Sequence, residues 1–263
     1  MPTFLTRRRT AAAVAATALL LPLTACGGGE KDKGAGEGGK TQLTVLGASS
    51  LTDVFKTAGA AYEKKHPDVK LKFSFAGSQE LAAHVKQGAP ADALVTADTK
   101  TMDGLKSDTG KPSVIAKNRL VIVTGKGNPK KIEDLKDLGA DSKKKPKVVL
   151  AAPEVPVGRY TQQVLDKQKI KVKPVSEEPN VRAVLSKVEL GEADAGVVYR
   201  TDAETATKKT ESVRIPDDQN NVASYPAATL KQSEHAKQAD AFVKWLGTPE
   251  AQKILRDAGF QKP

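Results

Sequence analysis

The sequence is short of the residues that catalytic and metal-binding sites use. Its 263 residues include one cysteine, three histidines and one tryptophan, and aromatic residues make up 4%. A single cysteine excludes an intramolecular disulfide. His66, His84 and His235 show no metal-ligand spacing, and no G-x-S-x-G nucleophile elbow is present. We therefore expect a protein that is not an enzyme and that holds neither a metal ion nor a cofactor.

Long hydrophobic runs are also rare, and the clearest one lies near the N-terminus. Residues 11–21 are apolar apart from one threonine and follow the basic run Arg7-Arg8-Arg9. This run is too short to span a bilayer comfortably and is typical of a signal peptide. Leu23-Thr24-Ala25-Cys26 resembles a bacterial lipobox, whose cysteine is lipidated. We expect residues 1–25 to be a lipoprotein signal peptide and Cys26 to be the lipidation site.

Half of residues 27–40 are glycines, and Ala35 is the one apolar side chain among them. A segment of this composition cannot bury a core, so residues 26–40 are predicted to form a flexible tether. With Cys26 lipidated, the protein would be extracytoplasmic and anchored to the outer face of the cell membrane. A cleaved secretory signal with an incidental cysteine is the alternative. Export by the Sec or by the twin-arginine route stays open.

Acidic residues are outnumbered, with 31 Asp and Glu against 42 Lys and Arg and a formal net charge of +11. Such a charge raises the question of a nucleic-acid or cell-wall partner. The lysines, however, are scattered among acids, as in KKIEDLKDL at residues 130–138. Secretion also argues against nucleic acid. We expect no nucleic-acid partner and a solvated basic surface that modestly speeds the arrival of an anion.

Strand and helix patterns alternate along the rest of the chain, which predicts an α/β fold with a parallel sheet. Two units of similar size predict two lobes, residues 41–120 with 226–263 and residues 121–225. Ligands of open α/β sheets bind beyond the carboxyl ends of the strands, so the site is expected in the cleft between the lobes. The expected strands are 43–46, 69–75, 91–96, 120–124, 148–151 and 195–199. The expected helices are 52–65, one from about Glu80, 158–167, 181–190, 233–246 and one from about 249 to 259.

Small residues, several of them polar, stand at four of the predicted helix entrances. A helix N-terminus carries a partial positive charge and N–H groups without intrahelical partners. Several such ends facing one cleft would bind an anion without cationic side chains. Ordinary N-capping by serine and asparagine is the alternative explanation. The four entrances are Ala48-Ser49-Ser50, Gly77-Ser78, Val157-Gly158 and Asn180-Val181.

From about Leu43 to Phe260, the sequence resembles the molybdate-binding proteins of bacterial ABC importers. The G-A-P-A-D and P-E-V-P-x-G-x-Y runs are the more specific signatures, and the serine loops are less so. The motifs that carry the resemblance are Ala48-Ser49-Ser50-Leu51-Thr52, Phe75-Ala76-Gly77-Ser78, Gly88-Ala89-Pro90-Ala91-Asp92 with Ala97-Asp98, Pro153-Glu154-Val155-Pro156-Val157-Gly158-Arg159-Tyr160, Val181-Arg182 and Gly196-Val197-Val198-Tyr199.

The resemblance implies a two-lobed, type II periplasmic-binding-protein-like fold with the ligand in the interlobe cleft. It implies that one molybdate or tungstate is bound through its oxygens, with no metal ligand from the protein. It also implies a monomer that delivers the anion to a permease with its ATPase. The implied contacts are the hydroxyl and amide of Ser50, Ser78, the amides of Val157 and Val181, and the hydroxyl of Tyr199. Val157 stands where the family usually has alanine.

A site made only of hydrogen donors suits molybdate and tungstate, because both are dianions without a proton at neutral pH. Hydrogen phosphate carries a proton and would need an acceptor. Sulfate or another tetrahedral oxyanion is the alternative ligand. The size of the cavity would have to discriminate between sulfate and molybdate. Arg159 and Arg182, next to contact positions, are expected to form surface ion pairs. Steering the anion or bracing the cleft is the alternative role.

Overall fold

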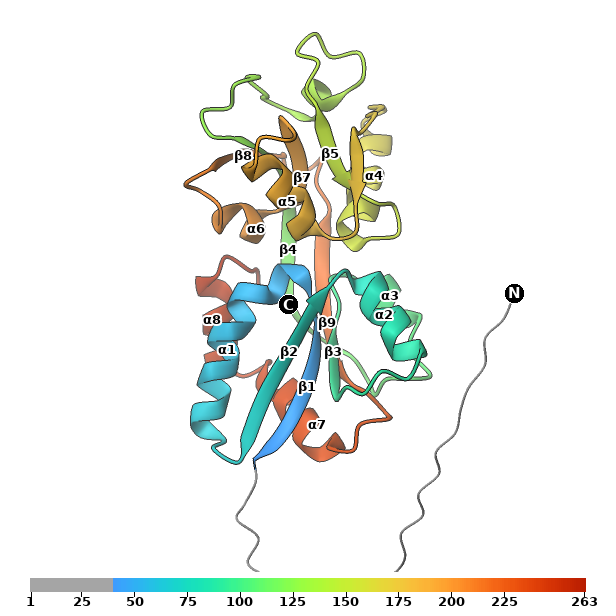
Figure 1. Ribbon diagram of the computed structural model, residues 1–263, viewed down its shortest axis with the longest axis vertical. Helices are drawn as coiled ribbons and strands as arrows, with labels where there is room; N and C mark the ends of the chain where they lie inside the picture. Colours follow the sequence, from blue (N-terminus) through green and yellow to red (C-terminus); the bar gives the residue numbers. More distant parts are fainter. Residues whose placement is uncertain (1–39) are drawn as a thin grey trace, which may run out of the picture. The chain divides into compact units, whose positions relative to one another are not determined.

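Strands and helices alternate through most of residues 40–263, which are the residues that the structure, a computed structural model, describes (Figure 1). The predicted signal peptide, Cys26 and nearly all of the predicted tether lie outside the described residues. The strands are β1 Thr41–Ala48, β2 Val69–Ala76, β3 Ala93–Val95, β4 Ser113–Gly125, β5 Val148–Ala151, β6 Ser176–Glu178, β7 Ala195–Tyr199, β8 Thr210–Arg214 and β9 Val222–Thr229. The α-helices are α1 Thr52–Lys65, α2 Ser78–Lys86, α3 Thr99–Asp103, α4 Pro156–Lys167, α5 Val181–Glu189, α6 Arg200–Glu204, α7 Ala236–Trp245 and α8 Pro249–Asp257, and the 3-10 helices are η1 Ser49–Leu51 and η2 Leu135–Leu138.

Local signals explain where several helices begin. Pro249 opens α8 directly after Thr248, whose side chain accepts a hydrogen bond from the N–H of Ala251. Asn180 caps α5 in the same way through the N–H of Ala183. Helix α1 spans the predicted residues, and the His66 that follows it has left the helical conformation before Pro67.

The strands form one sheet in the order β2-β1-β3-β9-β4-β7-β5-β6, and β8 also pairs with β4. Strand β1 is parallel to β2 and β3, and β5 is parallel to β6 and β7. The prediction of a parallel sheet is wrong for the middle, because β3–β9, β4–β9, β4–β7 and β4–β8 are antiparallel. Strand β9 carries Pro226, which lies beside an irregularity in its pairing with β4. Strand β9 was not among the expected strands because a proline argues against a strand. The expected alternation of strands and helices also fails here, since no helix lies between β8 and β9.

Strand β4 belongs to two groups of strands. Its residues 113–119 pair with β9, whereas residues 120–125 pair with β7 and β8. We call β1, β2, β3, β9 and residues 113–119, with the helices and loops that pack on them, the first half. We call β5 to β8 and residues 120–125, with the helices and loops that pack on them, the second half (Figure 1). The lobe boundaries expected from the sequence, at 120/121 and 225/226, fall inside β4 and β9.

Apolar packing holds each half together around its parallel strands. In the first half, the ring centroid of Tyr62 from α1 lies 5.1 Å from that of Phe242 from α7, and the ring centroid of Phe55 lies 6.5 Å from that of Phe242. In the second half, α5 buries Val184 and Val188 and contacts β5 and β7. This packing positions the loops at the carboxyl ends of the strands. Within residues 40–263, no helix has both the length and the apolar character needed to cross a membrane.

Candidate functional site

A small pocket lies between the two halves, beyond the carboxyl ends of β1, β2, β5 and β7. Parallel pairing aligns these ends, since Ala48 and Ala76 are register partners at the ends of β1 and β2. The pocket therefore occupies the place that the alternation of strands and helices predicts. Its lining residues are Ala48, Ser49, Ser50, Ala76, Gly77, Ser78 and Ala97 from the first half, and Val155, Pro156, Val157, Asn180, Val181 and Tyr199 from the second.

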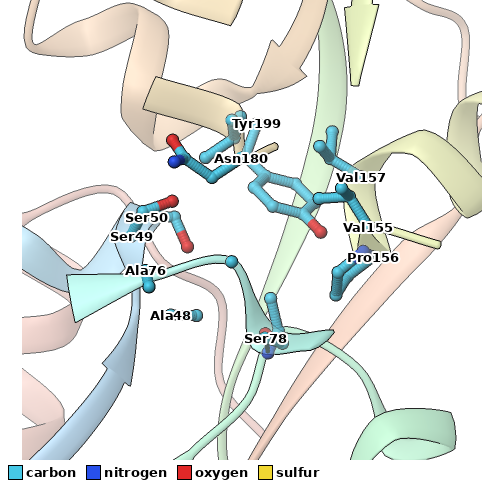
Figure 2. Close-up of a pocket in the computed structure, with 13 residues that line it drawn as sticks. Ala48, Ser49, Ser50, Ala76, Ser78, Val155, Pro156, Val157, Asn180 and Tyr199 are labelled. Carbon is cyan, nitrogen blue, oxygen red and sulfur yellow. Dashed lines mark hydrogen bonds between the residues drawn. The ribbon is translucent and has the colours of Figure 1, made fainter. Parts of the chain in front are cut away.

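All five site residues predicted from the sequence line this pocket (Figure 2). Ser50 lies in η1, and Ser78 is the first residue of α2. Across the pocket, Val157 lies in the first turn of α4, Val181 begins α5 and Tyr199 ends β7. Figure 2 shows the hydroxyl of Tyr199 pointing into the space between the two groups of residues.

The pocket is small and uncharged. Its cavity volume is about 10 Å³. Pockets for drug-sized molecules are roughly 300–1,000 Å³. Every lining residue is buried except Ala76 and Asn180, which are half-buried, and none of them is charged. Such a space suits a single small ion or molecule.

Backbone N–H groups at four helix starts face no protein acceptor. Among the hydrogen bonds of residues 40–263, none uses the N–H of Ser50, Ser78, Val157 or Val181. Ordinary capping does not explain the serines, because no side-chain cap is present at η1, α1 or α2. Asn180, by contrast, is a true N-cap of α5. The serine hydroxyls are thus available for a role in the pocket.

Each serine oxygen already has one partner in the protein. The Oγ of Ser78 accepts a hydrogen bond from the N–H of Ala97 at 2.9 Å. The Oγ of Ser50 lies 2.9 Å from the hydroxyl oxygen of Tyr225, in a buried contact. These contacts hold both side chains in place before any ligand arrives.

Tyr199 is different, because its hydroxyl is buried and has no hydrogen-bond partner among the described residues. Burial raises the pKa of this hydroxyl well above its usual value, so it stays protonated at physiological pH. Buried polar groups are nearly always hydrogen-bonded, and an exception calls for an explanation. A ligand that accepts a hydrogen bond from Tyr199 would supply the missing partner.

Residues 43–261 match the family described as bacterial extracellular solute-binding proteins. The chain belongs to this family. The molybdate-binding protein ModA of Mycobacterium tuberculosis is 38% identical over 252 residues, which cover 93% of this chain and 95% of the relative. A Bacillus subtilis protein named as an ABC transporter substrate-binding lipoprotein, YvgL, is 33% identical and covers 84% of this chain and 86% of its own. The resemblance drawn from the sequence motifs is confirmed.

The fold is also that of solved members of this class. The periplasmic molybdate-binding protein of Azotobacter vinelandii superimposes with a TM-score of 0.68 at 20% identity, over 84% of this chain and 99% of its own. The fold is therefore the two-lobed α/β fold of periplasmic binding proteins, as predicted. At this identity the likeness concerns the fold alone.

Two arginines join the two halves of the protein beside the pocket. Arg159 of α4 donates from Nε to the Oδ2 of Asp98 at 3.1 Å and from Nη2 to Thr101 at 2.9 Å. The Asp98 side chain is only 4% exposed. Arg182 of α5 contacts Asp53 of α1 at 2.8 Å. The expectation of a surface ion pair is thus wrong for Arg159, which the packing of α4 against the Asp98 loop places in a largely buried pair. These contacts agree with the alternative role of bracing the cleft.

Arg182 also bonds a carboxylate of its own half. Its Nε lies 2.6 Å from the Oδ1 of Asp202, a side chain with no exposed surface. Burial raises the pKa of Asp202 to about 6, and the positive charge of Arg182 only partly opposes this shift. Asp202 follows Tyr199 by three residues, so this charge network lies directly behind the pocket.

A close backbone contact closes one edge of the pocket. The side-chain amide of Gln79, in the first half, donates to the carbonyl oxygen of Pro179, in the second half, at 2.8 Å. The same carbonyl approaches Gly77 so closely that a Cβ atom there would lie 2.4 Å from it. Only glycine fits at this position with the halves as close as they are.

One sequence pattern resembles a site but is not one. The letters of residues 34–41, GAGEGGKT, satisfy the phosphate-binding pattern G-x-x-x-x-G-K-[ST]. That motif needs a helix immediately after the lysine, whose first N–H groups cradle the phosphates. Thr41 instead begins strand β1. The match is therefore incidental to a glycine-rich segment.

Sequence reasoning assigned no role to Tyr225, Asn118 or Asp98, whose hydrogen bonds lie around the pocket without lining it. Tyr225 is 175 residues from Ser50, and Arg159 is 61 residues from Asp98. No local motif signals contacts at such separations. The pairing of β3 and β4 with β9 creates the contact between Ser50 and Tyr225. The approach of α4 to the first half creates the contact between Arg159 and Asp98.

Proposed function

We propose that the protein is an extracytoplasmic receptor that captures molybdate, or its analogue tungstate, between its two halves and delivers it to an ABC importer. The observation that carries the proposal is the buried, uncharged pocket whose unpartnered Tyr199 hydroxyl faces the two serines. The ModA name of a 38% identical relative supports the choice of ligand.

The chemistry of the donor set explains how a dianion would be held without a cation. Seven groups could donate: the hydroxyls of Ser50, Ser78 and Tyr199 and the backbone N–H groups of Ser50, Ser78, Val157 and Val181. A hydrogen bond to a charged acceptor contributes roughly 1.5–3 kcal/mol net, and micromolar affinity needs about 8 kcal/mol. Several of these bonds together therefore suffice, and the helix N-termini behind them favour negative charge.

Binding would couple to closure of the two halves. Strand β4 crosses between the halves near Arg119 and Leu120, and the chain returns at the start of β9, so a hinge is expected at these two crossings. The Arg159–Asp98, Arg182–Asp53 and Gln79–Pro179 contacts would form on closure. The closed receptor, acting as a monomer, would then dock on a permease with its ATPase.

Lipid anchoring is part of the same proposal. The lipobox-like Leu23-Thr24-Ala25-Cys26 and the glycine-rich stretch after it would tether the receptor to the outer face of the cell membrane. The name of the Bacillus subtilis relative, a lipoprotein, supports this arrangement. Replacing Cys26 with serine should abolish acylation, which mass spectrometry of the membrane fraction would detect. Acylation that persisted in this variant would exclude Cys26.

Calorimetry with the purified protein tests the ligand directly. We expect molybdate and tungstate to bind with a stoichiometry of one and to displace each other. Sulfate in large excess should compete poorly, whereas tighter binding of sulfate than of molybdate would change the assigned ligand. No binding of any of these anions by folded protein would refute the proposed function. Metal analysis of the purified protein should also detect bound molybdenum or tungsten.

A further inference from the structure

The hydroxyl of Ser50 has a partner that the pocket alone does not explain. Tyr225 lies in β9, is fully buried and does not line the pocket, yet its hydroxyl oxygen lies 2.9 Å from the Oγ of Ser50. Either hydroxyl is chemically able to donate in this bond. If Ser50 donated to Tyr225, its hydrogen would point away from the pocket. The direction of this one bond therefore decides what Ser50 presents to a ligand.

Asn118 bears on that direction, because its side chain lies beside the Tyr225 hydroxyl. The Oδ1 of Asn118 accepts from the N–H of Arg119 at 2.9 Å, and its Nδ2 donates to the Oγ1 of Thr201 at 2.8 Å. These two bonds orient the amide so that its second N–H hydrogen is the group left for Tyr225. Asn118 therefore turns a donor, and no acceptor, toward Tyr225.

Only one arrangement then satisfies the Tyr225 hydroxyl. Its own hydrogen needs an acceptor, and among the described residues the Oγ of Ser50 is the acceptor within reach. If Ser50 donated instead, a buried O–H would be left without any acceptor, which is strongly unfavourable. Burial also raises the pKa of Tyr225, so the hydroxyl keeps the hydrogen that it donates.

We infer that Tyr225 is a positioning residue that makes Ser50 a hydrogen donor to the bound oxyanion. The inference rests on the proposed function. Because the Oγ of Ser50 accepts from Tyr225, its hydrogen is left to point into the pocket. Ser78 is fixed in the same sense, but by a backbone donor, the N–H of Ala97.

This arrangement gives Tyr225 an effect on selectivity although it does not touch the ligand. Two serines that both present hydrogens match an anion with no proton, such as molybdate. An anion with an O–H group, such as hydrogen phosphate, would place that hydrogen against them. Without Tyr225, Ser50 can rotate and accept from such an anion, so discrimination should weaken.

A double-mutant cycle on the full protein tests the inference. We expect Tyr225→Phe to weaken molybdate binding about 3- to 10-fold in calorimetry and to have less than a twofold effect in a Ser50→Ala background. The ratio of molybdate to phosphate affinity should fall as well, because only the direction of the Ser50 hydroxyl changes. Tyr62→Phe, a buried tyrosine remote from the pocket, is the matched control and should leave both quantities unchanged.

Equal losses for Tyr225→Phe with and without the Ser50 hydroxyl would overturn the inference while leaving the proposed function intact. If the wild-type protein bound neither molybdate nor sulfate, the proposed function would fail and the inference with it. Should thermal unfolding show that Tyr225→Phe does not fold, Asn118→Leu replaces it in the same cycle. Its loss of molybdate affinity must likewise disappear in the Ser50→Ala background, or the inference is wrong.

Discussion

The two walls of the pocket present hydrogen donors by different means. The first wall, made of the lining residues of the first half, consists of small residues, and its Ser50 and Ser78 oxygens already hold protein hydrogen bonds. The second wall, made of the lining residues of the second half, has larger and more apolar side chains. Its one hydroxyl, that of Tyr199, has no hydrogen-bond partner among residues 40–263. The hydroxyls of the first wall are therefore held in place before a ligand arrives, whereas the hydroxyl of the second wall gains its partner from the ligand.

This difference separates binding from stability. Removing the hydroxyl of Ser50 or Ser78 should weaken both the free protein and the complex, because it removes bonds present in both. A substitution of Tyr199 should weaken the complex alone. The following predictions test this contrast and take molybdate as the ligand.

The largest effect on binding is expected where the walls approach each other most closely. In Gly77→Ala, the new Cβ would lie 2.4 Å from the carbonyl oxygen of Pro179 on the opposite side, so closure should be hindered. Overpacking of this kind costs about 1–3 kcal/mol, and at the upper end binding would weaken roughly 100-fold. Calorimetry measures this loss, while the thermal unfolding temperature should change little.

Gly125→Ala is the control for this substitution, because a Cβ there meets nothing within 4 Å. It should leave molybdate affinity unchanged. Wild-type affinity in Gly77→Ala would show that binding does not require the close approach of the two walls.

Ser78→Ala is expected to have the next largest effect. It removes one donor to the anion, a loss of about 1–3 kcal/mol in binding, and leaves the buried N–H of Ala97 without its acceptor. The free energy of unfolding of the ligand-free protein should therefore fall by about 1 kcal/mol or more. Denaturant titration measures the second quantity, with Ser74→Ala in the exposed part of β2 as the control. An unchanged affinity would remove Ser78 from the site.

Tyr199→Phe should weaken molybdate binding about tenfold, because one hydrogen bond to a charged acceptor is lost. The ligand-free protein should be as stable as the wild type or more stable, since the substitution removes a buried hydroxyl that has no partner. Denaturant titrations of ligand-free Tyr199→Phe and Ser78→Ala, carried out side by side, compare their free energies of unfolding. A loss of stability as large as that of Ser78→Ala would contradict the contrast between the walls.

The last prediction concerns stability alone and is a pH dependence from Asp202, behind the second wall. Its pKa is raised to about 6 in the folded protein, against about 3.9 in an unfolded chain. Between these values the folded protein binds more protons, so the contribution of Asp202 to stability falls as pH rises from about 4 to about 6. In Asp202→Asn the free energy of unfolding should lack this fall. The same slope in the variant and the wild type would assign the titration to another group.

Local patterns predicted the elements that surround the pocket better than the sheet that joins them. The limits of α1, β5 and β7 agree with the expected residues, because apolar periodicity and turn residues lie within each segment. Strand β9 was missed because Pro226 interrupts its pattern, and the antiparallel pairing of β4 could not be read from neighbouring residues. The helix entrances that line the pocket were predictable for a similar reason, since helix starts have a local signature.

The sequence by itself determined that small residues stand at four helix starts without clustered histidines or acids, a pattern that allows an anion held by neutral donors or ordinary N-capping. The resemblance to a known family favoured the anion. The family motifs added Tyr199 to that set. The tertiary structure alone decided which way the donors point. Tyr225 and Asn118 reach Ser50 through strand pairing, and Arg159 reaches Asp98 across the halves. Hydrogen-bond direction depends on partners far away along the chain, so it emerges only once those segments have packed together.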